Sequence, residues 1–117
     1  MQFKKFSLTF FKNEEKILES VYENQDSVDN SLKFTMRDYE TMLNLEDKLF
    51  TRENEDFKFT LDILNENCTI LLKKEEMTLD INVDFCELKV LHNQIVLEYI
   101  IESDDAKNKI VITKEEC

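Results

Sequence analysis

The sequence predicts an antiparallel β-barrel of eight to ten strands, formed by one domain that spans residues 1–117. Short apolar stretches are separated by polar turns at intervals of roughly eight to twelve residues, which is typical of a meander. Several stretches alternate apolar and polar residues, as a strand with one wet face does. An antiparallel chain of this length must protect its sheet edges, and closure into a barrel removes them. A two-sheet sandwich is the alternative.

The clearest strand is Met77–Phe85, in which the odd positions are apolar and the even positions are polar. The phase then changes, because Leu88 and Val90 carry the apolar face onward. A one-residue slip would move a whole apolar set to the other face, so the change predicts a bulge or sharp bend between Phe85 and Glu87.

The remaining segments follow the same logic, since β-branched and aromatic residues dominate most of them. In chain order the other expected strands are Phe6–Phe10, Ile17–Tyr22, Leu32–Met36, Tyr39–Leu45, Lys48–Arg52, Phe57–Ile63, Cys68–Leu72, Ile95–Ile101 and Ile110–Thr113. The side chains expected to line the core are Phe34, Met36, Phe59, Leu61, Leu79, Ile81, Val83, Leu97 and Tyr99.

Two stretches also fit a helix. Residues 14–23 place Ile17, Leu18 and Val21 at helical spacing after two acids, and residues 37–49 contain good helix formers. Both stretches sit among regular hairpins, so strands are the favoured interpretation.

The chain contains no glycine and no proline, the residues on which tight turns usually depend. The hairpins must therefore turn on Asn, Asp and charged residues. Asn and Asp tolerate the left-handed backbone conformation that such turns require.

The last expected strand contains three consecutive β-branched residues, Ile110 to Ile112. We expect it either to pair with Phe6–Phe10 and close the barrel, or to dock on a second subunit. Closure, and hence a monomer rather than a homodimer, is favoured because the net charge of −11 repels a like subunit.

The same charge disfavours contact with nucleic-acid phosphates and anionic membranes, so neither is an expected partner. Residues 1–11 lack the pattern of a signal peptide, and no stretch approaches the ~18–20 apolar residues that cross a bilayer. A cytoplasmic location is expected. Cys68, Cys86 and Cys117 are too widely spaced to suggest zinc or a disulfide framework. The first two are expected to be small buried hydrophobes, and Cys117 a tail residue.

The residues give little support for catalysis. His92 is the single histidine, it has no acid or nucleophile beside it, and a solvated turn residue is the simpler interpretation. Phosphate-binding loops and dinucleotide fingerprints need glycine, so the absence of glycine excludes nucleotide binding through these motifs. Asp80, Asn82 and Asp84 share one strand face and could bind a cation weakly or form a polar groove, although a wet sheet face is the favoured interpretation. We therefore expect no enzyme activity, no cofactor and no metal site.

Arg52 is one of only two arginines, beside thirteen lysines, and it ends the run Lys48–Arg52. The fork of an arginine offers a geometry that lysine cannot copy. If the side chain turns inward, it needs a carboxylate partner or an anionic ligand. A structural ion pair is the favoured interpretation.

From Tyr39 to Thr113 the chain resembles the uncharacterised bacterial YwiB-like family of calycin-like (lipocalin-like) β-barrels. The resemblance rests on Tyr39-Glu40 before an alternating strand, on Lys48-Leu49-Phe50-Thr51-Arg52 followed by Phe57, on the strand pair 77–83 and 88–91, and on the last hairpin, 95–99 with 110–113. The family has glycine after its arginine, where this chain has Glu53. The resemblance implies a small closed barrel, with Arg52, Phe57 and Tyr99 as barrel residues, and no established activity.

The expected function is that of a non-catalytic binding module. A barrel of about eight strands has room for one small ligand, so the interior is expected to hold an apolar or amphipathic molecule. The candidate ligand-binding residues are Arg52, Phe34, Phe59 and Tyr99. The alternative is an acidic interaction protein, a nucleic-acid mimic or the partner of a basic protein.

Overall fold

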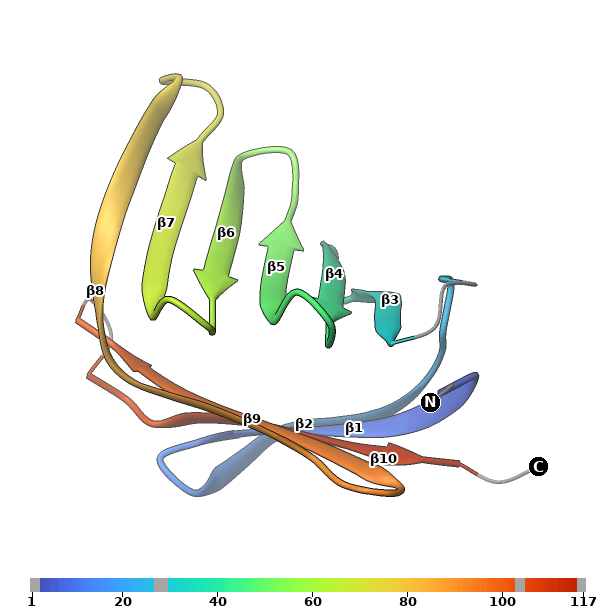
Figure 1. Cartoon of the computed structure of the whole chain (residues 1–117). Coiled ribbons are helices and arrows are strands. Elements are labelled where there is room, and N and C mark those ends of the chain that lie inside the picture. The colour runs from blue at the N-terminus through green and yellow to red at the C-terminus, as the bar shows by residue number, and fades with distance from the viewer. Residues whose placement is uncertain (1–2, 27–29, 103–104, 116–117) are drawn as a thin grey trace.

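The protein is described by a computed structural model that covers residues 3–26, 30–102 and 105–115, and these residues form ten strands and no helix (Figure 1). The expected all-β fold is confirmed, and neither stretch that also fitted a helix is helical: residues 15–23 form a strand, and residues 37–49 contain the strand Tyr39–Asn44 with turns on both sides. No helix in the described ranges is long and apolar enough to cross a membrane. The strands are β1 (Lys5–Lys12), β2 (Glu15–Glu23), β3 (Ser31–Met36), β4 (Tyr39–Asn44), β5 (Leu49–Glu53), β6 (Phe57–Asp62), β7 (Asn67–Leu72), β8 (Met77–Val90), β9 (Gln94–Ile101) and β10 (Asn108–Lys114).

The ten strands form one antiparallel sheet in the order β2-β1-β10-β9-β8-β7-β6-β5-β4-β3. Each pair is a hairpin between consecutive strands, with the exception of β1 and β10. In that pair Leu8 lies opposite Ile112 and Phe10 lies opposite Ile110. The expectation that the last strand pairs with the first is therefore confirmed.

The long strand β8 belongs to both halves of the sheet. Its residues 77–82 pair with β7, and its residues 83–90 pair with β9. The register shifts between Val83 and Phe85, so Asp84 is an extra residue and the strand bends there. The expected bend is thus confirmed, slightly earlier in the chain than the sequence suggested. We call β3–β7 with residues 77–82 the upper layer, and β1, β2, β9 and β10 with residues 83–90 the lower layer (Figure 1).

The barrel is nearly closed, because the two edge strands β2 and β3 meet at a seam. The segment after β2 bridges this seam: Asn24 donates from Nδ2 to the Ser31 carbonyl (2.9 Å) and accepts on Oδ1 from the Lys33 N–H (2.9 Å). The Gln25 N–H also donates to the Lys33 carbonyl (2.7 Å). Pairing of β10 with β1 does not itself complete the barrel, since β2 then becomes the edge.

The turns do without glycine. Eight described residues have a positive φ, and five of them are Glu, Arg or Lys. Asn13 and Glu14, with φ of 51° and 69°, form the two-residue turn between β1 and β2, as a primed hairpin turn requires. The Asn54 side chain supports the turn before β6 by accepting from the backbone N–H groups of Asp56 and Phe57. Turns on Asn, Asp and charged residues are thereby confirmed.

The two layers enclose a core that includes two groups of touching rings, Phe6–Tyr22–Phe34 and Phe50–Phe59–Tyr99. Most of the expected core is buried as predicted: Phe34, Met36, Phe59, Leu61, Leu97 and Tyr99. Ile81 and Val83 are half-buried against it. The prediction for Leu79 is wrong, since this residue is 41% exposed. Its side chain lies on the inner face, but at a level that the lower layer does not cover.

Candidate functional site: the open inner face of the upper layer

The register of the upper layer arranges its inward side chains in rows that run across the strands. The first row, nearest the lower layer, holds Leu43, Phe50, Leu61, Cys68 and Ile81. The second row holds Thr41, Arg52, Phe59, Ile70 and Leu79. The third holds Tyr39, Phe57, Leu72 and Met77. Alternation along each strand places all of them on the concave side of the sheet.

Burial decreases steadily from the first row to the third. In the first row Ile81 is half-buried and the other side chains are almost fully buried, whereas Leu79 in the second row is 41% exposed and Met77 in the third is 50% exposed. Figure 1 shows the reason: the end of β7 and the beginning of β8 extend farthest from the lower layer. We call the uncovered part the open inner face, and define it as Tyr39, Arg52, Phe57, Leu72, Met77 and Leu79.

Arg52 supplies the positive charge on this face. Its cross-strand neighbours Thr41 and Phe59 are buried, so the side chain lies on the inner face of β5. The guanidinium carbon lies 4.5 Å from the centroid of the Tyr39 ring, and the Tyr39 ring in turn lies 5.5 Å from that of Phe57. A cation over an aromatic face is stabilised by the ring quadrupole.

The ion pair favoured for Arg52 does not occur among the described residues, whose ion pairs all involve lysine. The Arg52 Nε is buried and has no hydrogen-bond partner there. Its neighbour Glu53 pairs instead with Lys73 (2.7 Å), and this hydrogen bond holds the Glu53 pKa below its usual range. The inner face therefore carries a guanidinium without a carboxylate from the described part of the chain.

The other three candidate ligand-binding residues lie below this face, in the core. The Phe34 ring packs against Phe6 with centroids 5.1 Å apart. The rings of Phe59 and Tyr99 lie 6.1 Å apart and both contact Phe50. These side chains pack against other rings of the core. Of the four candidates, only Arg52 belongs to the open inner face.

Sequence reasoning did not single out Tyr39, Leu72 or Met77 as site residues. Tyr39 and Met77 have polar residues on both sides, which indicates that they point inward as core residues do, whereas Leu72 follows Leu71 and its face is not evident from the sequence. It does not show how far each strand extends beyond the opposite layer, and this offset is what leaves them uncovered.

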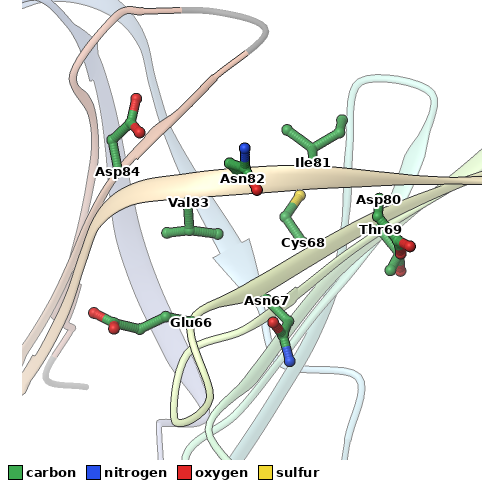
Figure 2. Close-up of a pocket in the computed structure, with 9 residues that line it drawn as sticks. All are labelled: Glu66, Asn67, Cys68, Thr69, Asp80, Ile81, Asn82, Val83 and Asp84. Atoms are coloured by element: carbon green, nitrogen blue, oxygen red, sulfur yellow. The ribbon is translucent and has the colours of Figure 1, made fainter.

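A second concave feature, a groove of about 660 Å³, lies where β8 leaves β7 to pair with β9 (Figure 2). Figure 2 shows the two strands separating toward the end that carries Glu66 and Asp84. Asp80 and Asn82 also line it, so the polar groove considered for this strand face exists. No group of three or more His, Cys, Asp or Glu side chains in the described ranges is arranged to hold a metal ion.

Cys68, Cys86 and His92 lie outside the residues that define the open inner face. Cys68 is buried in the first row and Cys86 is half-buried, and desolvation raises the pKa of each thiol to about 11. Thiols with such pKa values are poor nucleophiles at neutral pH. His92 is exposed in the turn between β8 and β9. Cys117 lies outside the described residues.

Comparisons of the chain with protein-family models, curated proteins and solved structures give no match.

Proposed function

We propose that the protein is a non-catalytic binding module that holds a small apolar or amphipathic molecule on its open inner face. The observation that carries the proposal is the exposure of Leu79 and Met77, which point inward and are nevertheless 41% and 50% exposed. Apolar side chains on a concave face gain free energy when a ligand removes them from water.

The neighbouring core supports this choice of face. Phe50 and Leu61, in the first row, are buried beside it, so a ligand would lie next to packed side chains. Side chains that are already packed lose little conformational entropy when a ligand binds. The location we propose is cytoplasmic, where the free thiols of Cys68 and Cys86 stay reduced.

Nile red, a neutral apolar dye, tests the proposed function. We expect its fluorescence to rise and shift to the blue on titration with the protein, and to do so much less with Leu79→Glu. Leu71→Glu is the matched control, because Leu71 lies one strand away and faces outward with a similar exposure of 36%. Equal dye binding by the two variants, or none by the natural protein, would contradict the proposal.

The acidic groove beside β8 favours a second candidate, an interaction with a basic protein. Glu66, Asp80 and Asp84 line this groove, and the chain carries a net charge of −11. Such a partner would bind more weakly as salt rises. Salt-sensitive binding of polylysine that Asp80→Asn with Asp84→Asn removes, combined with no Nile red binding, would favour this candidate over the first.

We further propose that the protein is a monomer, since its net charge opposes the approach of a second copy. Light scattering should give the mass of one chain at both low and high salt. A stable dimer under both conditions would contradict this.

A further inference from the structure

We propose that the ligand of the open inner face is a linear amphiphile with a carboxylate head, and that Arg52 receives this head. The inference rests on the proposed function and adds to it the charge of the ligand and the direction in which it lies. It follows from the surroundings of Arg52 and from the order of apolar residues across the upper layer.

The Arg52 guanidinium has donors to spare. Its central carbon lies 4.5 Å from the centroid of the Tyr39 ring, and contact with one ring does not use up the five N–H donors of the group. The Nε is buried without a hydrogen-bond partner among the described residues. A carboxylate is the acceptor that best matches the edge of a guanidinium.

The protein supplies no carboxylate to Arg52 from the part of the chain that is described. Glu53 is the next residue, but strand alternation turns it to the outer face, where it pairs with Lys73 at 2.7 Å. Glu40 lies opposite Glu53 on that outer face. The inner face therefore has positive charge at Arg52 and the balancing acids lie on the other side of the sheet.

The apolar part of the open inner face extends away from Arg52 in one direction. Phe57 on β6, Leu72 on β7 and Met77 with Leu79 on β8 follow one another across the sheet. Three strand spacings separate β5 from β8, which is about 14 Å. A head group at Arg52 would therefore place a medium-length alkyl chain across β6 and β7 toward β8.

The net charge of the protein makes this inference easy to distinguish from unspecific attraction. A field from −11 charges attracts cationic amphiphiles and repels anionic ones. A preference for the anion can therefore arise only from a local positive group on the binding face.

Displacement of Nile red by three decyl amphiphiles below their micelle concentrations tests the inference. We expect decanoate to displace the dye at a concentration roughly 10- to 100-fold lower than decanol, the factor that a charge-assisted hydrogen bond contributes. Decyltrimethylammonium should be the weakest of the three. Equal displacement by decanoate and decanol would overturn the role of Arg52 and leave the proposed function standing, whereas no binding of any probe would overturn both.

Arg52→Met removes the charge and keeps an unbranched side chain of similar length. We expect the variant to lose the preference for decanoate, measured within the variant as the ratio of the decanoate and decanol concentrations that displace the dye. Arg37→Met is the matched control with the same change in charge, because Arg37 lies in the exposed turn between β3 and β4. Arg52→Lys, which keeps the charge but not the fork, should retain part of the preference. A preference for decanoate that survives in a folded Arg52→Met would overturn the inference, and the comparison of the three amphiphiles on the natural protein decides it if that variant does not fold.

Discussion

The ring of Tyr22 in β2 lies against the ring of Phe34 in β3, with centroids 5.0 Å apart. These two strands are the edges of the sheet and are not adjacent in its hydrogen-bonded order. Phe6 completes the contact, since its ring touches both. The seam of the barrel is therefore closed by side chains packed between its edges, together with the hydrogen bonds of Asn24.

Truncation of Phe34 should open this seam. We expect Phe34→Ala to lower the free energy of unfolding by about 3–5 kcal/mol, as is usual for a buried phenylalanine. Urea denaturation measures the loss. Tyr22→Phe is the conservative control and should cost much less, because the ring is kept. A loss below about 1 kcal/mol for Phe34→Ala would contradict the description of the seam as packed core.

The turn residues with a positive φ offer a substitution that should raise stability rather than lower it. Glu76 has a φ of 49°, in the turn before β8, whereas its neighbour Glu75 is not among the positive-φ residues. Glu76→Gly should raise stability by about 0.5–1 kcal/mol because glycine adopts this conformation without strain. Glu75→Gly makes the same change in charge and should instead lower stability, since it only adds freedom to the unfolded chain. Thermal denaturation of the two variants side by side decides the matter, and equal shifts would contradict the assigned backbone conformation.

The register of the last strand can be tested through two adjacent residues. Ile112 is almost fully buried opposite Leu8, while Val111 lies on the outer face opposite Thr9. We expect Ile112→Ala to cost about 2–5 kcal/mol and Val111→Ala to cost less than about 1 kcal/mol. Chemical denaturation gives both values. A larger loss for Val111→Ala would mean that the strand is shifted by one residue.

The two thiols predict a dependence of stability on pH. Burial is the largest cause that raises the pKa values of Cys68 and Cys86 from 9.0 to about 11. Above pH 9 the unfolded chain loses these protons while the folded chain keeps them, so stability falls as the pH rises toward 11. Below pH 9 the contribution is fully present.

The measurement compares urea denaturation between pH 8 and 11 for the natural protein and for Cys68→Ala with Cys86→Ala. Other groups titrate in this range, so the difference between the two pH profiles is the readout. The double variant should lose less stability over the interval. Parallel profiles would show that the two thiols titrate normally in the folded protein.

Much of the architecture can be predicted from local patterns. The alternation in Met77–Phe85 and the change of phase after it indicate a long strand with a bend, because successive residues of a strand point to opposite faces of the sheet. The position of Arg52 on the inner face follows from the same alternation. The absence of glycine predicts turns on Asn, Asp and charged residues, although it does not select Lys48 or Glu66 as the residues that adopt a positive φ.

The uncovered part of the inner face could not be predicted in this way. Leu79 and Ile81 look alike in sequence, yet one is exposed and the other half-buried. The difference depends on where the lower layer ends, which is set by tertiary packing between strands far apart in the chain. The seam has the same origin, since no local pattern indicates that β2 would become an edge.

Because β10 pairs with β1, neighbouring strands in the sheet are neighbours in the chain, and the first strand follows directly after the last. The backbone N–H of Glu115 donates to the Lys5 carbonyl, so the last strand ends beside the beginning of the first. A chain with a short loop joining these two points, and with new termini between β2 and β3, would run from β3 to β10 and then through β1 to β2. Its strands would then occur in the sheet in the same order as in the sequence. The fold is a circularly permuted ten-strand meander, and its first and last strands, β1 and β10, lie within the sheet rather than at its edges.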